Sequence, residues 1–133
     1  MAGENVLPIT ECPDMISETF AFQFSITEDF QNTYLFYCER DTVVDAVFAI
    51  IDAADNDSTV DVKRGVSGTS VLTTPLAMDT PDAIKTGSID TDENFVPAGT
   101  TLWMVVDGLN TAAGAILLLR LRTRIRYSFL SQG

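Results

Sequence analysis

Apolar and polar residues alternate in two long segments of the chain. In residues 16–26 every second residue is apolar apart from Glu18, and three of these apolar residues are phenylalanines. Residues 119–127 alternate in the same way, with arginine at every second position from Arg120 to Arg126. Successive side chains of a β-strand point to opposite faces, so both segments are predicted to be strands with one buried and one exposed face.

Shorter apolar segments predict the remaining strands. Residues 43–51 are almost wholly apolar and β-branched, which favours a strand covered on both faces and leaves a buried helix as the alternative. Pro97-Ala98-Gly99 marks a turn, and residues 107–114 are expected to form a loop. The other expected strands occupy residues 33–39, 59–64, 101–106 and 115–127, with short strands near Val71 and at residues 84–89. Seven to nine short strands without a convincing helix predict an all-β domain, either a sandwich or a barrel.

One domain is expected, because the chain has 133 residues and 46% of them are hydrophobic, enough to form a core. Residues 1–15 show neither a helical nor a strand period and contain Pro8 and Pro13. They are therefore expected to form an extended N-terminal arm, with a disordered tail as the alternative. Residues 16–130 are expected to form the β-sandwich domain.

The charge distribution limits the function classes. The formal net charge of −11 argues against nucleic-acid binding, which relies on clustered Lys and Arg. Residues 1–6 lack the pattern of a signal peptide, and no apolar run approaches the length that spans a bilayer. We therefore expect synthesis in the cytoplasm without membrane contact, and a reduced Cys12 and Cys38 in preference to a disulfide.

The absence of histidine argues against an enzyme, because it removes the commonest general base and metal ligand. Three carboxylates at Asp90, Asp92 and Glu93 could serve a glycoside hydrolase, but they lie in a polar segment with nothing to raise a pKa. The acidic segment 52–61 lacks the glycine and glutamate of an EF-hand, so a solvated turn is favoured over a Ca²⁺ site. We expect no catalytic residue, no metal and no cofactor.

Trp103 alternates with Leu102 and Met104 in a predicted strand. Tryptophan on a β-sandwich can stack on sugars, but a single tryptophan without a polar platform is more typical of a core. The core position is therefore the favoured interpretation of Trp103.

The arginine row gives the most specific hypothesis. It comprises Arg120, Arg122, Arg124 and Arg126, half of the eight Lys and Arg residues of the chain. At a strand spacing of about 6.6–6.8 Å, neighbouring charges repel by roughly 0.6 kcal/mol in water. One interpretation is the solvated face of an edge strand, where charge deters aggregation. The favoured interpretation is a subunit or capsid interface, because arginine binds carboxylates through a planar, weakly hydrated fork.

Two pairs of segments carry a resemblance to a known family. They are VVDAVFAIID at 43–52 with STVDVKRG at 58–65, and FVPAGTTLWMVV at 95–106 with the return strand 114–122. Both pairs resemble hairpins of small virion proteins of tailed bacteriophages, among them the jelly-roll head decoration (cement) proteins. The resemblance covers residues 43–126.

The resemblance implies a jelly-roll-like antiparallel β-sandwich without catalytic residues. It further implies a homotrimer that binds the major capsid protein on the outer surface of the virion and stabilises capsomer junctions. The alternative function is a carbohydrate- or receptor-binding module of a tail fibre or base plate, which would rest on Trp103 and the tyrosines.

Overall fold

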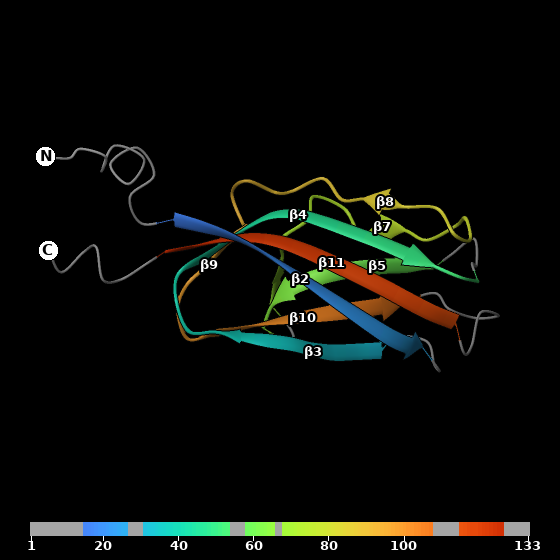
Figure 1. Cartoon of the computed structure of the whole chain (residues 1–133), viewed down its shortest axis with the longest axis horizontal. Helices are drawn as coiled ribbons and strands as arrows, with labels where there is room; N and C mark the ends of the chain where they lie inside the picture. Colours follow the sequence, from blue (N-terminus) through green and yellow to red (C-terminus); the bar gives the residue numbers. More distant parts are fainter. Residues whose placement is uncertain (1–14, 27–30, 54–57, 66–67, 108–114, 127–133) are drawn as a thin grey trace, which may run out of the picture.

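The protein is a sandwich of two antiparallel β-sheets (Figure 1), here described from a computed structural model of residues 15–26, 31–53, 58–65, 68–107 and 115–126. The first sheet has the order β2 (Met15–Ile26), β11 (Ala115–Arg126), β4 (Thr42–Ile51) and β8 (Lys85–Thr86), and β9 (Phe95–Val96) also pairs with β4. The second has the order β3 (Gln31–Cys38), β10 (Thr100–Asp107), β5 (Thr59–Arg64) and β6 (Thr69–Ser70), and β7 (Leu76–Ala77) also pairs with β5.

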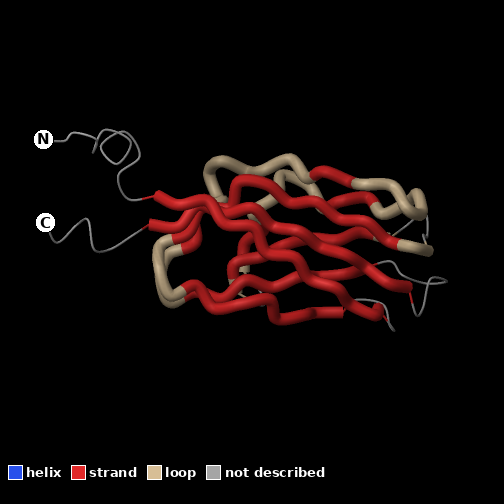
Figure 2. The backbone as a smooth tube through the Cα atoms, in the orientation of Figure 1, coloured by secondary structure: helices blue, strands red, loops and turns tan. Residues whose placement is uncertain are grey.

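The long strands alternate between the two sheets along the chain. β2 and β4 belong to the first sheet, β3 and β5 to the second, and the pattern ends with β10 in the second and β11 in the first. This connectivity is that of a jelly roll and confirms the predicted fold class, and Figure 2 shows that the described residues form strands and loops without a helix. The expected hairpins are wrong, because β4 does not pair with β5, nor β10 with β11. Each of these strands instead pairs with strands distant in sequence.

The core lies between the sheets and is almost entirely aliphatic. β10 and β11 contribute alternate residues that are almost completely inaccessible, and β4 and β5 complete the packing. Burying each such side chain contributes about 1.5–3 kcal/mol. The largest fully buried strand residues are Val44, Val47, Ile51, Val60, Val62, Leu102, Met104, Leu117, Leu119 and Leu121.

Aromatic residues close the side of the sandwich where β2 and β3 lie. The rings of Phe20 and Phe36 stack with their centroids 4.7 Å apart, and Phe22 lies 6.2 Å from Phe36. The phenylalanines of β2 are only partly buried, because β2 is at the edge of its sheet in the described part of the chain. The alternation that predicted this strand is therefore confirmed, with a less deeply buried apolar face.

Most predicted strands are present. Residues 43–51 form a strand, so the helix alternative is wrong. Two predicted strands are shorter than expected. The expected strand at residues 84–89 is reduced to β8, and the strand near Val71 to β6 and a single bridge between Leu72 and Ile89. The arm (residue 15 excepted, which begins β2), Cys12 and most of the expected loop 107–114 lie outside the described residues. No helix that could cross a membrane occurs in the described ranges.

The turn expected at Pro97-Ala98-Gly99 is present. The amide of Thr100 donates a hydrogen bond to the carbonyl oxygen of Pro97 at 3.2 Å, and Gly99 has a φ of +91°. Positive φ at the third position of a turn favours glycine, since a Cβ atom is strained there. Gly99 thus fixes the entry into β10.

Candidate functional site

The arginine row lies on the outer face of the first sheet. Arg120, Arg122 and Arg124 are exposed, whereas Leu121 and Thr123 between them are fully buried. The predicted separation of charge and core on one strand is therefore observed. Arg126 is the last residue of β11, and its side chain lies outside the described part of the chain.

The strand that carries the row is central, not an edge. β11 pairs along almost its whole length with β2 on one side and β4 on the other. The interpretation of the row as protection of a free strand edge is therefore wrong. Central strands expose only a face, so any partner of these arginines must approach that face.

A β-bulge in β4 places a carboxylate beside one arginine of the row. Arg122 pairs with Ala46 and Thr123 with Val44, so Asp45 is left without an opposite residue. An extra residue of this kind changes the direction of a side chain. The Nε atom of Arg124 donates to both carboxylate oxygens of Asp45 at 3.0 Å. The partner carboxylate predicted for the row thus comes, at this position, from the same chain.

The charges of Arg120 and Arg122 are not paired with a carboxylate of the described residues. Within the described ranges neither forms an ion pair, and both side chains are exposed. Their neighbours on β2 are Ala21 and Thr19, which carry no charge. Among the three described side chains of the row, Arg124 forms an ion pair and Arg120 and Arg122 do not.

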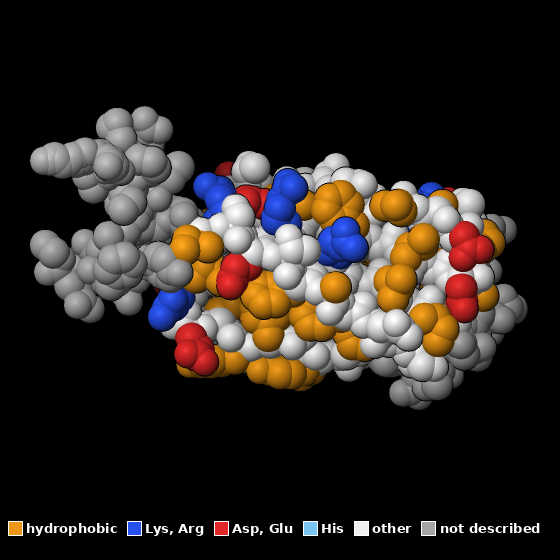
Figure 3. Space-filling view, viewed as in Figure 1, with side chains coloured by type: hydrophobic (Ala, Val, Ile, Leu, Met, Phe, Trp, Pro, Cys, Tyr) orange, Lys and Arg blue, Asp and Glu red, His pale blue; other side chains and the backbone are white. Residues whose placement is uncertain are grey.

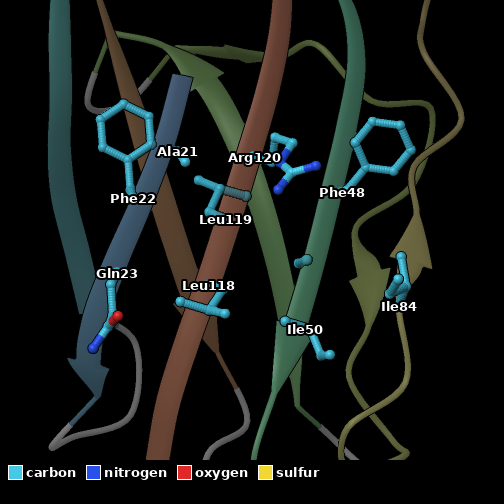
Figure 4. Close-up of a pocket in the computed structure, with 10 residues that line it drawn as sticks. Ala21, Phe22, Gln23, Phe48, Ile50, Ile84, Leu118, Leu119 and Arg120 are labelled. Carbon is cyan, nitrogen blue, oxygen red and sulfur yellow. The ribbon is translucent and has the colours of Figure 1, made fainter. Parts of the chain in front are cut away.

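The arginine face continues into an apolar hollow of about 570 Å³. It lies over β2, β11 and β4 beside Arg120, as Figure 4 shows, and Figure 3 shows basic and hydrophobic side chains together on this face. Leu118 and Ile84 are 44% and 71% exposed there. The other outward side chains that line the hollow are Ala21, Gln23, Phe48 and Ile50. Arginine beside exposed aliphatic and aromatic residues is the composition of a protein interface more than of a plain solvated surface.

The outer face of the second sheet is aromatic. Trp103 is half-buried and points away from the core, so the favoured core position for this residue is wrong. Its ring lies 5.5 Å from that of Tyr34 at 73°, and its Nε1 atom donates to Oγ1 of Thr101 at 2.9 Å. A bulge at Leu35 brings Tyr37 to the same face, opposite Thr101, and both tyrosines are about half exposed.

The other acidic candidates have structural partners. Asp52 accepts a hydrogen bond from the amide of Ile116 at 2.7 Å, and Asp61 accepts hydrogen bonds from Val62 and Ser70. These contacts favour the solvated turn over a Ca²⁺ site for the described part of segment 52–61. No group of three or more acidic or thiol side chains in the described ranges could hold a metal ion.

The proposed carboxylate hydrolase also gains no support from the geometry. Glu93 forms an ion pair with Arg64, and Asp90 accepts a hydrogen bond from the amide of Asp92 at 3.0 Å. Asp92 is exposed, so no apolar pocket surrounds it. The Cys38 thiol is free and buried, and this burial raises its pKa, the opposite of what activates a nucleophile.

Comparisons with known proteins identify solved structures that have a similar fold. No protein-family model and no curated protein matches the sequence. A chain of the cyanophage Pam1 capsid asymmetric unit is similar in structure, with a TM-score of 0.54 and 14% identity over 85% of this chain and 84% of that one. A chain of Bacillus endospore appendages, described as disulfide-linked pili, has a TM-score of 0.51 and 16% identity over 86% and 90%. At such identities the likeness establishes a shared fold.

Sequence reasoning found the arginines but missed the hollow and Asp45. The outward residues Ile116 and Leu118 precede Arg120 in the same alternation, so the change from apolar to charged along one face was a readable signal. Phe48, Ile50 and Ile84 come from other parts of the chain, and only pairing of the strands brings them beside β11.

Proposed function

We propose that the protein is a non-enzymatic virion structural protein, a decoration (cement) protein that binds the outer surface of a phage capsid as a homotrimer. The observation that carries the proposal is the outer face of the first sheet, where free arginines adjoin an apolar hollow. Such a face combines burial of apolar area with charge-directed contacts. Its partners would be acidic surfaces of the major capsid protein and neighbouring copies of the chain.

The fold and the composition support this proposal. The jelly roll is a fold of capsid proteins, and a chain from a phage capsid shares it. The net charge of −11 would keep free subunits apart in solution. The Arg120 and Arg122 side chains are then the local exception that directs binding.

Capsid binding tests the proposal directly. Capsids purified from a phage strain that lacks this chain would be incubated with the protein and sedimented, and the mass of the free protein measured by light scattering. We expect a trimer that co-sediments, and an Arg122→Glu variant that binds at least about tenfold more weakly while it melts at the same temperature. The matched control is Lys63→Glu, the same change of charge on the other sheet.

A wild-type protein that stays monomeric and does not co-sediment would refute the decoration role. Equal binding by wild type, Arg122→Glu and Lys63→Glu would refute the part assigned to the arginine face.

A second candidate function is carbohydrate or receptor binding by a tail fibre or base plate module. The observation that favours it is the outward position of Trp103 beside Tyr34, with Tyr37 on the same face. Aromatic faces with a polar tip suit contacts that are apolar on one side and hydrated on the other. On a glycan array, binding that Trp103→Ala abolishes and Phe95→Ala keeps would support this function. The Phe95 side chain, also about half exposed, is the matched control, and an array without signal would count against it.

A further inference from the structure

We propose that the apolar hollow on the first sheet binds the N-terminal segment, residues 1–14, of a second copy of the chain. The inference rests on the proposed assembly into homo-oligomers and names the contact that would hold the copies together. It follows from the shape and charge of the hollow and from the composition of this one segment.

The hollow offers an apolar floor with positive charge at one end. Leu118 and Ile84 are exposed in it, and Phe48 and Ile50 project from β4, which lies between β11 and β8. Arg120 borders the hollow and has no ion-pair partner among the described residues. A volume of about 570 Å³ is within the size range of protein pockets that bind ligands. The complementary ligand is an extended segment with apolar side chains and negative charge.

Residues 1–14 have that composition. They contain Val6, Leu7 and Ile9 flanked by acidic residues, and they contain no Lys or Arg. The acidic residues are Glu4, Glu11 and Asp14. By contrast, residues 127–133 contain no acidic side chain. Charge complementarity therefore selects the N-terminal segment as the occupant.

The segment also has the length for this contact. Fourteen extended residues span up to about 46–50 Å, whereas β2 from Met15 to its position beside the hollow at Phe22 covers about 23–24 Å. The segment is therefore about twice as long as the distance from its attachment point to a hollow on a sheet of this kind. Pro8 and Pro13 lack a backbone N–H, so the segment is poorly suited to extend a sheet edge as a strand and better suited to lie in a groove.

Two full-length variants test the contact by complementation. Leu118→Glu places a negative charge in the hollow and leaves the segment intact, and the double change Leu7→Ser, Ile9→Ser does the reverse. In sedimentation velocity we expect each variant alone to associate about 10- to 100-fold more weakly than wild type. Their equimolar mixture, with one variant fluorescently labelled, forms a 1:1 heterodimer, because one intact segment can still reach one intact hollow.

Controls separate association from folding. Tyr37→Ser alters a side chain of similar exposure on the opposite sheet and is expected to associate like wild type. Thermal unfolding of each variant shows whether it folds, and Ile84→Ser, at the most exposed position of the hollow, replaces Leu118→Glu if that variant does not.

Three results would overturn the inference: monomeric wild type at all concentrations, unchanged association of either variant, or a mixture that stays monomeric. A mixture that stays monomeric would mean that the segment binds its own sheet or another site. If the mixture fails while wild type still co-sediments with capsids, this inference alone is wrong. If co-sedimentation fails while the mixture forms a heterodimer, the decoration role is wrong and the contact between copies stands.

Discussion

Charge reversal at two neighbouring arginines should have unequal effects on stability. Arg122 and Arg124 lie on the same face of β11, and a sequence-based interpretation treats them alike. The structure distinguishes them, because the guanidinium of Arg124 contacts both carboxylate oxygens of Asp45. We expect Arg124→Glu to lower the free energy of unfolding and Arg122→Glu to leave it nearly unchanged.

The expected loss at Arg124 is modest because the pair is partly exposed. The side chains of Arg124 and Asp45 are 47% and 23% accessible, and ion pairs of this kind contribute about 0.2–1 kcal/mol. Reversal adds a repulsion of similar size between the new carboxylate and Asp45, for a total of about 0.4–2 kcal/mol. For a chain of this length that corresponds to a fall in Tm of roughly 1–8 °C. Arg122→Glu should stay within about 0.5 kcal/mol, as for surface changes without a specific partner.

Thermal unfolding at a protein concentration that keeps all variants monomeric measures both effects. Repeating the pair of reversals in an Asp45→Asn background is the control, since removal of the carboxylate should abolish most of the difference. The difference should also shrink at 1 M NaCl, where the Debye length is about 3 Å. Equal losses for Arg122→Glu and Arg124→Glu, or a difference that survives in the Asp45→Asn background, would refute the assigned role of the bulge.

Three further predictions concern the core, a turn and the buried thiol. Leu121→Ala should cost about 2–5 kcal/mol in urea unfolding, because Leu121 is fully buried between the sheets; a loss below 1 kcal/mol would contradict this packing. Gly99→Ala should cost about 1–2 kcal/mol in thermal unfolding, because its φ is +91°, and an unchanged Tm would show that the turn adapts. Burial raises the pKa of the Cys38 thiol, and a hydrogen bond with Thr42 acts in the opposite direction. The contribution of the protonated thiol to stability is therefore complete below the ordinary thiol pKa of about 8.5. This contribution is lost as the pH rises through the raised pKa. Urea midpoints between pH 8 and 10 in a Cys12→Ser background should therefore fall more steeply than in Cys12→Ser, Cys38→Ala, and parallel curves would contradict the burial.

The sequence could predict the features of the candidate site that depend on a single strand. The alternation from Leu119 to Arg126 separates charge from core whatever the rest of the fold does, because side-chain direction in a strand is local. The same local rule predicted the strand at residues 16–26. Trp103 shows its limit, because alternation assigns residues to two faces without stating which face is inside.

Pairing between distant strands could not be predicted in this way. The expected hairpins were wrong, because a jelly roll sends consecutive long strands to opposite sheets and joins β11 to β2 and β4 instead. The bulges at Leu35 and Asp45 depend on the register of those pairings. A shift by one residue reverses the faces of a strand, so neither the Arg124–Asp45 pair nor the position of Tyr37 follows from a single strand.

By itself, then, the sequence determined an all-β chain with an acidic surface and one strand that is arginine on one face and core on the other. Those properties depend on neighbours along the chain and on composition. The tertiary structure alone decided that this strand is central, that one arginine is neutralised by Asp45, and that Leu118, Phe48 and Ile84 form a hollow beside Arg120. The physical reason is that a face of a sheet is shared by several strands, and its charge and shape exist only after those strands have paired.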